Sequence, residues 1–203
     1  NSTGRAWAQQ RNGNFQDQEF DINTAAGIGA PVPNGASFHA MEYVGSTMYT
    51  AGFAGIFVSP SLATLDPVTG ASTLIGALGT DQMTGIAYDV TTNVMYGVTG
   101  GQASSLYTID LVTGVATLVG DTQLSFGSLQ FGPDGNLYAG GTSGIAGDLY
   151  QLDPLTGAGT FVGVTGFGAG QGNGLSGLTL LIPEPASLSL LALGSLLAFR
   201  RKR

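Results

Sequence analysis

An internal repeat of about 44 residues constrains the fold of this chain more than any other feature of its sequence. Each copy contains an aspartate followed four residues later by a glycine, and seven residues after the aspartate comes a second element, Thr-x-x-Gly. The aspartate–glycine pairs are Asp66 with Gly70, Asp110 with Gly114 and Asp153 with Gly157, and a weaker copy lies at Phe20 to Thr24. A chain with such a period builds its core by stacking copies of one structural unit.

Each repeat unit is predicted to form four short strands. In the second unit these are Thr84–Asp89, Val94–Val98, Ser105–Asp110 and Val115–Val119, which are rich in β-branched and aromatic residues and are separated by turn residues. Tyrosines also recur in register and are expected in the core, at positions 49, 96, 107, 138 and 150. No apolar periodicity typical of a helix precedes residue 186.

The repeated aspartate and glycine are expected to shape a turn. An aspartate side chain can accept hydrogen bonds from backbone amides just ahead of it, and glycine adopts the left-handed conformation that short hairpin loops require. We therefore expect positive φ at Gly70, Gly114 and Gly157, and we assign these glycines and the three aspartates a structural role. One carboxylate per repeat is too few for a calcium loop, so no metal is expected.

Antiparallel units of four strands that repeat every 40–45 residues are typical of β-propeller blades, and this pattern resembles the looser bacterial propellers without a Trp-Asp dipeptide. The sequence predicts an all-β fold with three complete blades at about 38–79, 83–121 and 126–165. A half-blade at 15–32 and one strand at Leu175–Leu180 remain. Either the two chain ends complete one blade, or further blades precede residue 1. A β-solenoid or a β-sandwich is the alternative architecture.

The end of the chain has three parts. Pro183-Glu184-Pro185 is followed by fourteen uncharged residues, Ala186–Phe199, and then by Arg200, Arg201, Lys202 and Arg203. We expect the apolar run to form a short membrane helix of about 21 Å, against a hydrocarbon core of about 30 Å. The terminal cations would stay at the cytoplasmic surface, which places the body outside.

This tail resembles the PEP-CTERM sorting signal of exopolysaccharide-producing Gram-negative bacteria. The resemblance implies Sec-dependent export, transient anchoring in the inner membrane, and removal of the tail by an exosortase at or near Pro183-Glu184-Pro185. A plain C-terminal anchor is the alternative. We divide the chain into an N-terminal remnant at 1–14, a repeat domain at 15–181 and a sorting signal at 182–203. No signal peptide begins at Asn1, so we expect that the natural protein extends further upstream.

Charge and residue types narrow the function. Residues 1–182 carry two arginines against twelve acids, a formal charge of −10, which excludes nucleic acid as a partner. The chain has no cysteine, its repeat domain has no lysine, and His39 is its single histidine. The repeat domain therefore lacks the nucleophiles for thiol and Schiff-base catalysis. No Ser/Asp arrangement near His39 in the sequence suggests that His39 acts as a general base. We expect no catalytic residue and no cofactor.

The expected function is a non-enzymatic structural or binding role in the exopolysaccharide or biofilm matrix. The protein would be exported, transiently anchored, and then located at the cell surface or in the matrix. One alternative is a secreted propeller-type lyase or hydrolase, with catalytic carboxylates from loops such as those of Asp81 and Asp148. Another alternative is an adhesin that binds ice or surfaces.

Overall fold

The computed structural model describes residues 5–10, 16–21, 24, 26–33, 37–53, 59–166, 174–175 and 177–178. The apolar run at 186–199, predicted to be a helix, lies outside these residues. Within them the fold is all-β: every ordered element is a strand, and every strand pairing is antiparallel.

The strands form one three-stranded sheet and three four-stranded sheets. The N-terminal sheet contains β1 (Arg5–Gln10), β2 (Gln16–Asp21) and β3 (Gly27–Pro33). Sheet 1 contains β4 (Ser37–Val44), β5 (Thr47–Phe53), β6 (Ser61–Leu65) and β7 (Ser72–Ala77). Sheet 2 contains β8 (Met83–Asp89), β9 (Val94–Thr99), β10 (Ser105–Ile109) and β11 (Ala116–Asp121). Sheet 3 contains β12 (Phe126–Phe131), β13 (Leu137–Gly141), β14 (Asp148–Leu152) and β15 (Gly159–Val164).

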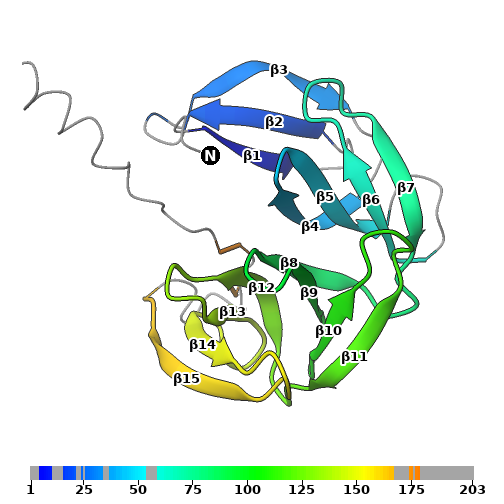
Figure 1. Ribbon diagram of the computed structural model, residues 1–203. Coiled ribbons are helices and arrows are strands. Elements are labelled where there is room, and N and C mark those ends of the chain that lie inside the picture. Colours follow the sequence, from blue (N-terminus) through cyan, green and yellow to red (C-terminus); the bar gives the residue numbers. More distant parts are fainter. Residues whose placement is uncertain are drawn as a thin grey trace, which may run out of the picture.

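Successive sheets follow one another along an arc, with β4, β8 and β12 on its inner side and β7, β11 and β15 on its outer side (Figure 1). This arrangement is consistent with a propeller-like repeat fold, and the three complete units match the predicted ones. The N-terminal part differs from the prediction. A half-blade was expected at 15–32, but the sheet there has a third strand, β1, which lies within the stretch assigned to the N-terminal remnant.

The repeat extends to irregularities in strand pairing. The pairing register between the first and second strands shifts at the same position in each four-stranded sheet, between Phe38 and Ala40, Met83 and Gly85, and Phe126 and Ser128. Such a bulge leaves one extra residue on the inner strand and re-aims its side chain. His39, Thr84 and Gly127 occupy this position in the three sheets.

The recurring turns have one geometry. In the turn after β10, Asp110 Oδ1 accepts hydrogen bonds from the backbone N–H groups of Val112 at 2.8 Å and Thr113 at 2.9 Å. Asp66 and Asp153 accept equivalent bonds from Val68 and Leu155. The glycines that end the three turns have positive φ: Gly70 +71°, Gly114 +79° and Gly157 +75°.

The turns of sheets 2 and 3 also pack on the preceding sheet, which explains the second glycine of the repeat. A Cβ on Gly76 would lie 2.1 Å from the carbonyl oxygen of Thr113, and a Cβ on Gly120 would lie 2.1 Å from that of Thr156. No side chain fits such a contact. The glycine at the end of the Thr-x-x-Gly element therefore lets the turn of the following sheet approach the backbone closely.

The hydrophobic core lies between the sheets rather than at the centre of the arc. Leu62 of sheet 1 packs with Met83, Ile86 and Met95 of sheet 2 in one cluster. A second cluster joins sheets 2 and 3, and a third contains sheet 1 residues only, on the face turned away from sheet 2: Phe38, Met48, Ala63 and Leu65. Each sheet thus has two buried faces only when it has a neighbour on both sides.

Candidate functional site

The candidate site is an open cavity of about 580 Å³ at the junction of sheets 1 and 2. It lies where β8 begins, and its walls come from both sheets and from the β7–β8 loop. The lining residues are Pro60, Thr80, Asp81, Gln82, Thr84, Gly100 and Gly101. Carboxylate, amide and hydroxyl groups therefore face one space.

Hydrogen bonds from three chain segments hold the walls of the cavity. The backbone N–H of Leu78 donates to the carbonyl oxygen of Pro60 at 3.0 Å, and that of Gly100 donates to the carbonyl oxygen of Gln82 at 2.9 Å. The Gln82 side-chain amide also hydrogen-bonds Nδ1 of His39, the bulge residue of β4. His39 thus ties sheet 1 to the loop that enters sheet 2, and the Gln82 amide is held in place.

Small, mostly buried hydroxyl side chains occupy the equivalent junction between sheets 2 and 3. Ser125 takes the place of Gln82, and its Oγ lies 2.7 Å from Oγ1 of Thr142. Thr122 donates to the carbonyl oxygen of Ser104 at 2.7 Å, and all of these groups except Thr142 are buried. The loop here has four residues, against five between β7 and β8. The junction with the cavity thus differs from the next one in having a longer loop and the longer Gln82 side chain.

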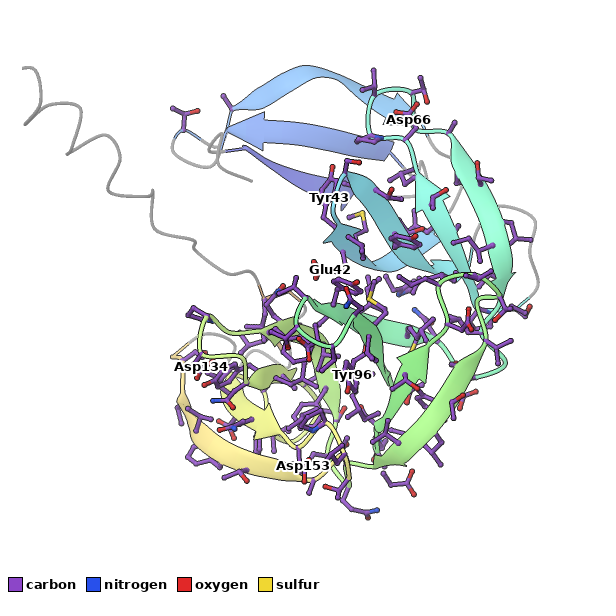
Figure 2. The ribbon with its side chains drawn as sticks, in the orientation of Figure 1. Glu42, Tyr43, Asp66, Tyr96, Asp134 and Asp153 are labelled. Atoms are coloured by element: carbon purple, nitrogen blue, oxygen red, sulfur yellow. The ribbon has the colours of Figure 1, made fainter. Side chains whose placement is uncertain are left out.

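Glu42 is a second unusual group. It lies on β4 opposite Tyr49, on the face that packs against sheet 2. The equivalent residue of sheet 2 is the buried Ala87. Burial raises the pKa of the Glu42 carboxyl to about 7, although the backbone N–H of Tyr43 donates to Oε1 at 3.1 Å and opposes the rise. Figure 2 shows Glu42 in the interior of the molecule, whereas Asp66 and Asp153 lie at its periphery.

The repeated aspartates lie apart from both features. Hydrogen bonds from the backbone lower the pKa of each carboxyl, chiefly from Val68 to Asp66, from Thr113 to Asp110 and from Leu155 to Asp153. Among the described residues, no three His, Cys, Asp or Glu side chains gather into a possible metal site.

From the sequence, Asp81 is only one loop carboxylate among several, and neither Gln82 nor Glu42 is expected in a site. Asp148 begins β14 and does not line the cavity. The repeat did contain a signal for Glu42: the equivalent residues of the other units are the uncharged Ala87 and Gln130. The sorting residues Pro183, Glu184, Pro185, Arg200, Arg201, Lys202 and Arg203 lie outside the described part of the chain. In the part that is described, no helix has the length and apolarity needed to cross a bilayer.

Comparison with known proteins identifies the tail and the fold class. Residues 181–203 match the model of the PEP-CTERM protein-sorting motif, which implies processing by an exosortase and membrane-associated sorting. No curated protein matches the chain.

Solved structures are similar to the body in fold. A structural genomics protein of unknown function from Bacteroides thetaiotaomicron VPI-5482 has 20% identity and a TM-score of 0.57, with 80% of this chain and 42% of that one covered. A luciferin-regenerating enzyme has 14% identity and a TM-score of 0.53, with coverages of 80% and 59%. A chain of a nidogen/laminin complex has 14% identity and a TM-score of 0.57, with coverages of 81% and 62%.

At these identities the likeness shows the fold alone, and the chain spans about half the length of the structures that it matches. The chain therefore carries a PEP-CTERM sorting motif at residues 181–203, behind an all-β body of three four-stranded antiparallel sheets consistent with a propeller-like repeat.

Proposed function

We propose that this protein is exported through Sec, anchored transiently in the inner membrane, and released by an exosortase to the cell surface or the exopolysaccharide matrix, where its body binds glycans without catalysis. The sorting motif at 181–203 is the observation that carries the export part of the proposal. Replacement of Pro183, Glu184 and Pro185 together by alanine tests it. The variant should keep its tail and stay with the membrane, whereas normal release of the variant would contradict the proposal.

The cavity between sheets 1 and 2 supports the binding part. Asp81 and Gln82 supply acceptors and donors beside the hydroxyls of Thr80 and Thr84, a set that suits the hydroxyl groups of a sugar. The formal charge of −10 on residues 1–182 disfavours polyanionic chains. The ligand class is therefore a neutral saccharide.

Glycan binding by the purified body tests this assignment. Asp81→Asn and Gln82→Ala should each weaken binding of a neutral glycan about tenfold or more, because each removes a hydrogen-bonding group from the cavity. Asp121→Asn is the matched control, since Asp121 is an exposed carboxylate that does not line the cavity. Equal binding by Asp81→Asn, Asp121→Asn and the unchanged body would contradict the assignment.

Glu42 favours a second candidate function, a secreted lyase or hydrolase. A carboxyl with a pKa near 7 can act as general acid or base at neutral pH. Glu42 does not line the cavity described above, which favours the binding role. Turnover in a screen of polysaccharide substrates that is lost in Glu42→Gln and retained in Asp81→Asn would establish the enzyme instead.

A further inference from the structure

Three of the four polar side chains that line the cavity offer a ligand mainly hydrogen-bond acceptors. Thr80 Oγ1 donates its single hydrogen to the carbonyl oxygen of Asp81 at 2.9 Å. Thr84 Oγ1 directs its own hydrogen to the carbonyl oxygen of Phe126 at 3.0 Å, with that of Val98 next at 3.3 Å. The ionised carboxylate of Asp81 has no hydrogen to donate. These three side chains therefore favour ligand groups that donate, such as the hydroxyls of a sugar.

Gln82 is the fourth polar side chain, and what it offers depends on which way its amide is turned. A carboxamide has an oxygen that accepts and a nitrogen that donates, and a rotation of about 180° exchanges the two. The structure places Nε2 of Gln82 against Nδ1 of His39. Because an amide nitrogen cannot accept a hydrogen bond, Nδ1 accepts here and the imidazole is neutral, with its proton on Nε2. The contact leaves Oε1 and one N–H of Gln82 for the cavity.

His39 holds this amide from the bulge position of β4, and the equivalent residues of the other sheets make different contacts. Thr84 also bonds to the following sheet, but its partner there, the carbonyl oxygen of Phe126, is a backbone group that cannot turn over. Gly127, at the bulge of β12, has no side chain. An imidazole changes its charge between about pH 5 and 8. Among these three bulge residues, only His39 joins a titratable ring to a side chain that can present either of two groups.

We propose that His39 is the specificity-determining residue of the cavity, because its protonation state decides whether Gln82 offers an acceptor to the ligand. The neutral ring holds Nε2 of the amide and leaves Oε1 for a ligand hydroxyl. The protonated ring donates from Nδ1, so the amide turns to give it Oε1, and only N–H groups of Gln82 remain for the cavity. This inference rests on the proposed saccharide binding and adds which sugar groups the cavity recognises.

The two states of the amide favour different ligand groups. With the neutral ring, all four polar side chains of the cavity present an acceptor, and a sugar hydroxyl donates to Oε1 of Gln82. With the protonated ring, the same hydroxyl meets an N–H and has to turn its hydrogen away. Mild acid therefore weakens the binding of a ligand that is recognised through donated hydroxyl hydrogens.

Other titratable groups lie on β4 and on the elements packed against it, which are β5, β8 and the β7–β8 loop. They are Glu42 and Tyr43 on β4, Tyr49 on β5, Asp81 in the loop, and Tyr88 and Asp89 on β8. Asp81 is the one that lines the cavity with Gln82. Burial raises the pKa of Glu42 to about 7, within the range in which an imidazole titrates, so Glu42 requires its own control variant.

Nitrogen–proton NMR spectra of the full chain test the contact without any ligand. His39 is the single histidine, so its ring signals are identified directly, and the side-chain amide of Gln82 is identified by its loss in Gln82→Ala. Between about pH 5.5 and 8 the Gln82 amide signals should change with the same midpoint as the ring signals.

His39→Asn is the matched variant, because the side-chain oxygen of asparagine takes the place of Nδ1 as an acceptor and binds no proton in this range. The Gln82 amide signals of this variant should stay constant. Gln82 signals that do not follow the ring in the unchanged protein, or that change equally in His39→Asn, would overturn the proposal.

Binding of neutral glucans and galactans to the full chain at pH 5.5 and 8 tests the consequence. The unchanged protein should bind about tenfold more weakly at the lower pH, because the turned amide removes one acceptor from the cavity. His39→Asn should bind equally at the two pH values, whereas Glu42→Gln should keep the difference. A difference that persists in His39→Asn and disappears in Glu42→Gln would assign the effect to Glu42 and contradict the proposal. If no glycan binds at either pH while the Gln82 signals follow the ring, the proposed function fails and the contact stands, so the two failures are distinguishable.

Discussion

The Glu42→Gln variant should change how stability depends on pH. Glu42 stands on the face of β4 that packs against sheet 2, and the loss of hydration there raises the pKa of its carboxyl from 4.5 to about 7. Between these pH values the folded protein binds more protons than the unfolded chain. The free energy of unfolding therefore falls as pH rises from about 4.5 to about 7, and the Glu42 contribution is constant above and below that range.

The size of the effect follows from the two pKa values. A difference between 4.5 and about 7 corresponds to about 3 kcal/mol at 1.36 kcal/mol for each tenfold change in proton affinity. Glutamine has nearly the same shape as glutamate and no charge, so the free energy of unfolding of the variant should not show this decrease between pH 4.5 and 7. The carboxyls of Asp66, Asp110 and Asp153 do not make the free energy of unfolding vary with pH in this range, because their pKa values are lowered from 3.8 in the folded state.

Urea unfolding followed by circular dichroism at pH 4.5, 6 and 7.5 would measure the effect. The stability of Glu42→Gln relative to the unchanged protein should rise by about 3 kcal/mol across this range. Asp153→Asn is the control: its carboxyl is exposed and its lowered pKa lies outside the window, so its difference should not vary with pH. A pH-independent difference between Glu42→Gln and the unchanged protein would refute the assignment of a desolvated carboxyl.

Two further variants test the packing of the repeat. Gly114→Ala should cost at least about 2 kcal/mol, because Gly114 has a φ of +79° and a Cβ there would lie 2.8 Å from the carbonyl oxygen of Gly76. Gly135→Ala is the control, because Gly135 has a φ of +78° but nothing lies within 4 Å of a Cβ there, so its free energy of unfolding should fall by only about 1 kcal/mol. Equal losses in the two variants would mean that the close contact between Gly114 and Gly76 does not limit the residue at position 114. Leu106→Ala should lower the free energy of unfolding by about 2–5 kcal/mol in denaturant titrations, since Leu106 is fully buried between sheets 2 and 3. A loss below 1 kcal/mol there would mean that the two sheets pack loosely.

Much of the fold could be predicted from the sequence because turn chemistry is local. An aspartate that accepts bonds from amides two and three residues ahead, followed by a glycine with positive φ, defines a hairpin without reference to the rest of the chain. The period of these turns then sets the number and length of the strands between them. The β1 strand was missed because residues 5–10 precede the first recognisable turn.

The candidate site could not be predicted in the same way. Thr80 to Gln82 resemble an ordinary solvated loop, and only the packing of sheet 2 on sheet 1 brings them opposite Pro60 and next to His39. The sequence also does not show that Ser125 and Thr142 hydrogen-bond to each other at the next junction. A cavity is a property of how two surfaces fit, and neighbouring repeat units contribute residues about 40 positions apart.

The sequence alone determined the repeat, the all-β class and the sorting motif, because each depends on residues close together in the chain. The tertiary structure decided which glycines meet a backbone, that Asp81 and Gln82 line a cavity with Pro60, and that Glu42 is desolvated. The physical reason is that burial depends on the neighbouring sheet. Glu42, Ala87 and Gln130 occupy the same position in their units, yet only Glu42 places a carboxyl against a following sheet.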